Sequence, residues 1–112
     1  MKDCTVLKIA DWSTIPGGRF RRTGDYSAEE YRDDILIPEL DKDPEKTVIV
    51  DLSNTVGMAA SFIEEVFGGV TRKLGKSRIL SQLVVVCPEY QRYADEAADC
   101  IVDVINMKET KT

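Results

Sequence analysis

Two short, mostly apolar runs stand out in the hydrophobic pattern of the chain, at residues 47–52 and 83–88. Their length and their β-branched side chains predict strands that are buried on both faces. A further strand is predicted over residues 5–9, near the N-terminus. Residues 16–18, Pro-Gly-Gly, are typical of a turn. The alternating residues 19–23 that follow predict a half-exposed strand, and together with the turn they predict a hairpin.

The helical segments are marked by three- and four-residue spacing of apolar side chains and by end signals. Ser27, followed three residues later by Glu30, predicts an N-cap, and Pro38 is expected to end or kink the helix that it opens. The predicted buried faces carry Tyr31, Ile35 and Leu40 in the first helix; Phe62, Ile63, Val66, Phe67, Val70 and Leu74 in the second; and Tyr93, Ala94, Ala97, Ile101, Val104 and Ile105 in the last.

The second helix is predicted to begin at Ser61 and to stop at Gly75, and the last helix to begin at Glu89. Residues 108–112 are expected to fray. The order of elements predicts an α/β fold with an approximately four-stranded mixed sheet and three helices packed over it, in which helix-linked strands are parallel. All 112 residues are expected to form one domain with a core over about residues 5–107.

Composition narrows the classes of function. Fifteen basic against 20 acidic residues give a net charge of −5, which has the wrong sign for a nucleic-acid-binding protein. No apolar run is long enough to cross a membrane or to act as a secretory signal, so a cytoplasmic protein is expected. Three separated cysteines indicate reduced, mostly buried thiols. No metal site and no cofactor are predicted.

The absence of histidine makes catalysis by this chain less expected. With no histidine, the commonest general base and the commonest transition-metal ligand are missing. A nucleophile set could be imagined from Asp51, Ser53 and Ser61, in which the two serines supply hydroxyl groups. No base is present that would activate either hydroxyl. We therefore expect a protein that is not an enzyme.

The segment with most information is residues 48–62, a buried strand followed by a polar loop and a helix start. In α/β sheets ligands and partners meet the loops at the carboxyl ends of the strands. The strand ends in Asp51-Leu52-Ser53, Met58 precedes the helix, and Ser61 lies at the helix start. With these residues and the stretch 61–68, Ser-Phe-Ile-Glu-Glu-Val-Phe-Gly, the chain resembles the STAS domains of bacterial anti-sigma factor antagonists, and more closely the STAS-like proteins related to them.

The resemblance implies a regulatory protein-interaction module. In the antagonists, the serine at the Ser61 position is phosphorylated by an anti-sigma factor with ATP-binding kinase character. It therefore implies a partner of that anti-sigma-factor-like or ATPase/kinase-like type. The contact residues expected from it are Asp51, Ser53, Asn54, Gly57, Met58, Ala59, Ala60, Ser61, Phe62 and Glu65. The antagonists carry Asp-Ser-Ser-Gly where this chain has Ala59-Ala60-Ser61-Phe62, so Ser61 acting only as an N-cap is the competing interpretation.

Other interpretations remain at this point. One is a small-anion or nucleotide site that combines the same helix N-terminus with the nearby Arg19, Arg21 and Arg22. Another is a structural homodimer, since Gly68-Gly69 within a helix costs about 1 kcal/mol per glycine and indicates close packing, either inside the domain or against a second copy. Cys87, before the last helix, is read as a buried apolar residue in preference to a redox group.

Overall fold

The computed structural model describes residues 3–110. It contains a parallel sheet of three strands in the order β1 (Cys4–Lys8), β2 (Thr47–Asp51) and β3 (Leu83–Val86). In the register, Val6 lies beside Ile49 and Ile49 beside Val84. The α/β class is confirmed, whereas the predicted fourth strand and the mixed sheet are wrong for the described part of the chain.

The predicted hairpin is replaced by a loop that closes onto the next helix. Residues 19–23 hold only a short 3-10 turn, Arg21–Thr23. Backbone N–H groups of Gly17, Ala28 and Glu29 donate to the carbonyls of Tyr26, Gly18 and Arg19, which bends this segment back on itself. The alternating arginine side chains that resembled a half-exposed strand instead reach acidic residues on the helices, at Glu64, Glu65 and Asp34.

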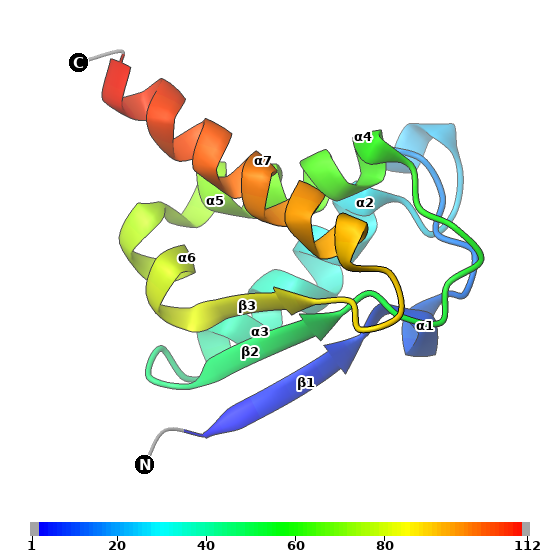
Figure 1. Cartoon of the computed structure of the whole chain (residues 1–112), viewed down its shortest axis with the longest axis horizontal. Helices are drawn as coiled ribbons and strands as arrows, with labels where there is room; N and C mark the ends of the chain where they lie inside the picture. The colour runs from blue at the N-terminus through cyan, green and yellow to red at the C-terminus, as the bar shows by residue number, and fades with distance from the viewer. Residues whose placement is uncertain (1–2, 111–112) are drawn as a thin grey trace.

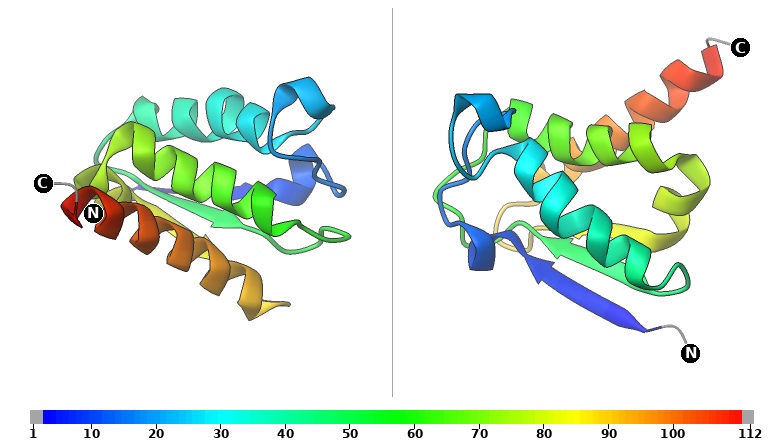
Figure 2. Two further views of the ribbon diagram at one scale, coloured as in Figure 1. Left: turned by 90° about the horizontal axis from the view of Figure 1, so that it is seen from above. Right: turned by 180° about the vertical axis from the view of Figure 1, so that it is seen from behind.

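Three helical segments lie side by side over one face of the sheet (Figure 1 and Figure 2). The first comprises α2 (Ala28–Glu30), a π-helical turn η2 (Tyr31–Leu36) and α3 (Ile37–Lys42). The second comprises α4 (Ala60–Ile63), a π-helical turn η3 (Glu64–Gly68) and α5 (Gly69–Leu74). The third is α7 (Gln91–Thr110). The segment η3 packs between η2 and α7 and forms the centre of this layer.

The ends of several elements differ from the prediction. The chain leaves β1 one residue early, because Ile9 opens a short helix α1 (Ile9–Trp12), and a second unpredicted helix, α6 (Lys76–Gln82), follows Gly75. Ser27 caps α2 as predicted, since its Oγ accepts the Glu30 N–H at 3.1 Å. The helix does not end at Pro38; the π-helical turn precedes this proline and changes the hydrogen-bonding pattern where its missing N–H and its ring would disrupt a regular α-helix.

At the C-terminal end, the last helix begins at Gln91, later than the predicted Glu89, and extends to Thr110 through part of the segment that we expected to fray. Residues 111–112 lie outside the described part. The predicted helix faces are confirmed: Tyr31, Phe62, Phe67 and Ala97 are each no more than 1% exposed. Cys87 is buried as predicted, but Cys4 is exposed.

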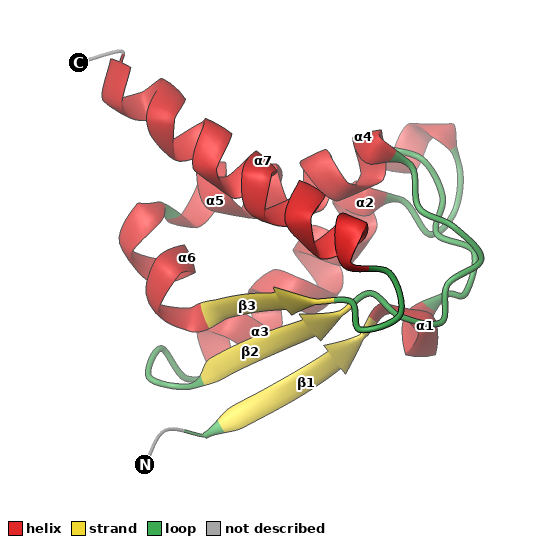
Figure 3. Ribbon diagram, in the orientation of Figure 1, coloured by secondary structure: helices red, strands yellow, loops and turns green. Residues whose placement is uncertain are grey.

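Within residues 3–110, no helix layer covers the opposite face of the sheet (Figure 3). Parallel sheets are usually covered on both faces. Here Val6 and Val84 are 53% and 44% exposed, and Ile49 between them is half-buried. The sequence predicted β2 and β3 as strands buried on both faces. Only the face of β2 toward the helices is buried, at Val48 and Val50, and β3 has no fully buried residue.

Candidate functional site

Three loops meet at the carboxyl ends of the strands and are tied together by hydrogen bonds. The Leu52 N–H donates to the Val86 carbonyl at 2.9 Å, and the Val56 N–H donates to the Thr14 carbonyl at 2.7 Å. The Asn54 N–H donates to Glu89 Oε1 at 2.6 Å. We call the surface formed by residues 13–18, 52–61 and 87–90 the carboxyl-end surface. These bonds hold its loops in one arrangement before any partner arrives.

The loop after β2 owes its shape to its first polar residues. The Asp51 carboxylate accepts the Ser53 N–H at 2.9 Å, which forms a tight turn at the end of the strand. Asn54 then adopts a left-handed conformation with φ 68°, which asparagine tolerates better than most residues. The Ser53 hydroxyl is buried and has no hydrogen-bond partner in the described part of the chain. Asp51 and Ser53 therefore shape the loop, and only Asn54 is exposed among these three.

Two large aliphatic side chains project from the carboxyl-end surface. Val56 is 81% exposed and Ile15 is 68% exposed, and the Val56–Thr14 backbone bond joins the loops that carry them. Neither residue was predicted from the sequence as a contact residue. Their signal was an apolar residue inside a segment of turn formers, Ile15 before Pro16 and Val56 before Gly57. An apolar residue in such a segment has no core to enter, so it is a candidate contact residue.

Ser61 lies one residue further into the helix than predicted. The helix α4 begins at Ala60, its N-cap is Ala59, and the cap has no side-chain hydrogen bond. The prediction that Ser61 begins the helix, and the competing interpretation of Ser61 as its N-cap, are therefore wrong. Alanine cannot accept a hydrogen bond from the first turn, so this helix start lacks the stabilisation of about 1 kcal/mol that a polar cap provides. The Ser61 side chain is half-buried and lies in the first turn, beside the exposed Ala59 and Ala60.

The remaining predicted contact residues are largely buried. Phe62 is fully buried and Met58 is 9% exposed, and both belong to the main hydrophobic core. Glu65 is 7% exposed and is engaged in ion pairs. These three residues therefore position the helix and the loop, and they offer little surface area for contact with a partner. Gly57, at the end of the loop, is half-buried.

Glu65 belongs to an ion-pair cluster between the first two helical segments. The cluster comprises Arg19, Arg32, Asp33, Glu64, Glu65, Arg72 and Lys73. Arg32 and Glu65 form its buried centre, with side-chain exposures of 8% and 10%. Arg19 Nη1 donates to Glu64 Oε1 at 2.8 Å and to Glu65 Oε1 at 3.1 Å, so it connects the loop after β1 to the helix that begins beside Ser61.

The two adjacent helix glycines make room for this cluster. A Cβ on Gly69 would lie 2.7 Å from Arg32 Nη1, and a Cβ on Gly68 would meet the Glu64 carboxylate. The close packing that the sequence indicated is therefore packing inside the domain, against charged side chains that cross the helix. In the described structure these glycines do not form the flat patch that a homodimer through this helix would require.

The arginines predicted for an anion site are largely engaged. Arg19 binds Glu64 and Glu65, and Arg21 makes a two-point contact with Asp34 at 2.7 and 3.1 Å. Arg22 lies over the Phe20 ring, 5.0 Å from its centroid. An anion at this surface would have to displace carboxylates from Arg19 or Arg21.

The carboxylates of the cluster give stability a definite pH dependence. Hydrogen bonding from Arg72, and then from Arg19, lowers the pKa of Glu64, and Arg32 lowers the pKa of Asp33. A lowered folded-state pKa stabilises the fold above the unfolded-state pKa, and this contribution is lost as the pH falls through the folded-state value. We expect the urea midpoint to be constant near neutral pH and to decline below about pH 4. Asp33→Asn should make that decline shallower, and an unchanged slope would contradict this origin.

Within residues 3–110 no cluster of histidine, cysteine, aspartate and glutamate side chains could hold a metal ion. None of the described helices is both long and apolar enough to span a membrane. The parallel sheet, the helices on one of its faces and the loops at the carboxyl ends of its strands define the class of the protein, which is an α/β domain.

The family follows from comparison with known proteins. A family model described as "STAS-like domain of unknown function (DUF4325)" matches residues 27–87, which is more than half of the chain. The chain therefore belongs to this STAS-like family, as its sequence predicted. The match covers α2 to the end of β3 and includes Ser61 and the loop that precedes it. No curated protein and no solved structure matches the chain.

Proposed function

We propose that this protein is a regulatory protein-interaction module, similar in mode of action to anti-sigma factor antagonists, which binds its partner through the carboxyl-end surface. The observation that carries the proposal is that Val56 and Ile15 are exposed on two loops that a backbone hydrogen bond joins. The loop that carries Val56 leads into the helix turn that contains Ser61. Preorganised loops with projecting apolar side chains lose little conformational entropy on binding. The partner class is an anti-sigma-factor-like or ATPase/kinase-like protein in the cytoplasm.

Phosphorylation of Ser61 is the proposed switch. A phosphate would add a charge of roughly −1.5 to −2 on the docking face, at the positive end of the helical segment 60–74. Glu64 and Glu65 lie three and four residues later, so they share a helix face with Ser61. Arg19 bonds to both carboxylates. The phosphate would compete for Arg19 and thereby act on the loop that carries Ile15.

Binding without catalysis fits the surroundings of the polar residues in this region. The Asp51 carboxylate is committed to the Ser53 N–H, and no side chain bonded to the Ser61 hydroxyl is described that would act as a base. A hydroxyl without a base is a weak nucleophile but a suitable acceptor for a phosphate delivered by a kinase.

The decisive experiment compares Ser61→Asp with Ser77→Asp. Ser77 is an exposed serine that is also the second residue of a helix, α6, so it is a matched control for charge and position. Wild type and Ser77→Asp should capture the same protein from a lysate of the native cells. Ser61→Asp should reduce its capture at least tenfold, because the charge falls on the docking face.

Val56→Asp tests the surface independently of phosphorylation and should cause a comparable loss. Intact-mass measurement of the recovered wild type should show a phosphorylated fraction that is absent from Ser61→Ala. Capture that is equal in all variants would refute the carboxyl-end surface as the contact surface. Loss with Val56→Asp alone, together with no phosphate, would keep the surface and remove the switch.

A further inference from the structure

An aliphatic cavity of about 210 Å³ lies along β3, the outer strand on the opposite side of the sheet from β1. Its lining comprises Leu80 of α6, Leu83 and Val85 of β3, and Ala98, Val102 and other aliphatic residues of α7. Leu80 and Val102 are 60% and 49% exposed, so the cavity opens to the surface. Pockets for drug-sized ligands measure about 300–1,000 Å³. A smaller, wholly aliphatic cavity instead suits the side chains of a partner protein.

The backbone of β3 is open beside this cavity. Within residues 3–110, β3 pairs with β2 alone, and α7 lies over it on the helix side (Figure 1). The Val86 carbonyl accepts the Leu52 N–H at 2.9 Å, so the backbone groups of Val86 face β2 and those of Val85 face away from it. Edge strands are commonly protected by charges, proline or a bulge, whereas the sequence of β3 is Leu-Val-Val-Val. This edge therefore offers the N–H and the carbonyl of Val85 to an added strand.

The rim of the cavity on α7 is acidic. Residues three apart are neighbours on a helix surface, so Asp95 lies beside Ala98 and Asp99 lies beside Val102. Both carboxylates are exposed, and neither forms an ion pair with another residue of the described part of the chain. A segment that enters the cavity therefore meets two carboxylates that no cation neutralises.

We propose that this cavity and the edge of β3 bind an extended, basic segment of a partner protein, which adds a strand to the sheet. Side chains that lie opposite each other on adjacent strands share one face of the sheet. Residues beside Leu83 and Val85 therefore insert aliphatic side chains into the cavity. Lysine or arginine two positions away on either side lies on the same face, toward Asp95 and Asp99. This binding site is separate from the carboxyl-end surface and does not depend on the function proposed for that surface.

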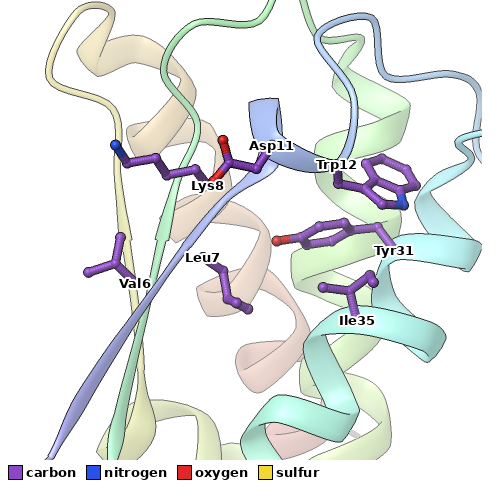
Figure 4. A pocket seen from close by; sticks show the side chains of 7 residues that line it. All are labelled: Val6, Leu7, Lys8, Asp11, Trp12, Tyr31 and Ile35. Carbon is purple, nitrogen blue, oxygen red and sulfur yellow. The ribbon is translucent and has the colours of Figure 1, made fainter.

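The charges favour such a segment over a second copy of this chain. Antiparallel pairing of β3 with β3 of a second copy would place both α7 helices on one face of the joined sheet. Asp95 and Asp99 of the two copies would then lie on the sides that face each other, where like charges oppose association. The other outer strand, β1, lacks this selectivity, because Lys8 and Asp11 place charges of both signs at the cavity beside it (Figure 4).

A peptide of the proposed pattern tests the site. The probe is Lys-Thr-Val-Thr-Leu-Thr-Lys with blocked ends, in which every second residue belongs to the basic and aliphatic face. The order of charged and aliphatic residues is the same in both directions, so the probe does not presuppose parallel or antiparallel pairing. In two-dimensional amide NMR spectra of the full chain, we expect shifts at Leu83–Val86 and along α7 near Ala98. The midpoint should be on the order of 1 mM, as for a weak peptide contact.

Two matched pairs of variants locate the contact. Val102→Lys should weaken binding at least fivefold, because it removes an aliphatic wall of the cavity and places a cation beside the lysines of the probe. Val6→Lys changes an equally exposed valine on β1 and should leave the midpoint unchanged. Asp99→Asn should weaken binding about threefold, as expected for one exposed ion pair. Asp11→Asn removes the same charge beside β1 and should have no effect.

The peptide Glu-Thr-Val-Thr-Leu-Thr-Glu is the control for charge, and it should cause no shifts at concentrations that saturate the lysine probe. Dispersed amide signals confirm that each variant is folded. The proposal would be overturned by equal binding of the two peptides, by shifts along β1 in place of β3, or by an unchanged midpoint for Val102→Lys. A complete lack of shifts with the lysine probe would also overturn it.

Discussion

Arg32→Met should lower the free energy of unfolding by about 3 kcal/mol, because it leaves the buried Glu65 carboxylate without its closest cation. The side chains of Arg32 and Glu65 are 8% and 10% exposed, and Arg32 also bonds to Asp33 at 2.8 Å. Methionine keeps most of the volume, so the loss reports the charge. Urea unfolding followed by far-ultraviolet circular dichroism measures it.

The matched control is Arg21→Met. Arg21 also contacts a carboxylate, Asp34, but both side chains are about half exposed. Exposed pairs contribute roughly 0–1 kcal/mol. Equal losses in the two arginine variants would show that burial of the cluster does not determine its contribution to stability.

The second large effect is expected from alanine at the two helix glycines. Gly69→Ala should destabilise the fold by about 2 kcal/mol, because the new methyl group would displace the buried Arg32 guanidinium and break its bond to Glu65. Gly68→Ala meets only the movable ends of the Glu64 and Arg72 side chains. There the gain in helix propensity of about 1 kcal/mol should offset most of the cost.

The comparison of the neighbouring glycines separates packing from propensity. Both variants gain the same intrinsic preference for helix, so a difference between their urea midpoints reports the side chain that each methyl group meets. Equal stabilities would mean that Arg32 moves aside at no cost, which would also reduce the loss expected for Arg32→Met.

The elements that the sequence predicted well are those whose own side chains determine them. The β-branched runs that contain β2 and β3 and the apolar stripes of the helices are local patterns, and the structure confirms them. The strand predicted over residues 19–23 was wrong, because an alternation of arginines with other residues has two explanations. Alternation predicts a strand, but ion pairs to Glu64, Glu65 and Asp34, more than ten residues away, hold these arginines.

The position of the candidate site could be predicted from the sequence, but the side chains that it exposes could not. The strand–loop–helix pattern placed the loop, because loops at the carboxyl ends of parallel strands gather together. Which side chains are exposed depends on contacts with other segments. Val56 projects because its backbone is bonded to Thr14, and Glu65 is buried because Arg19 and Arg32 reach it. The sequence gives no local sign of these partners.

The direction of the chain through the sheet also separates the carboxyl-end surface from both ends of the domain. β1 enters the sheet at the amino ends of the strands, where Cys4 lies beside Thr47, and α7 runs from the carboxyl-end loops back toward the same side (Figure 1). An affinity tag, a fluorescent protein or a neighbouring domain joined at either end would therefore emerge away from Val56 and Ser61. This arrangement is suited to modular use, in which the domain is attached to other polypeptides while the carboxyl-end surface stays accessible.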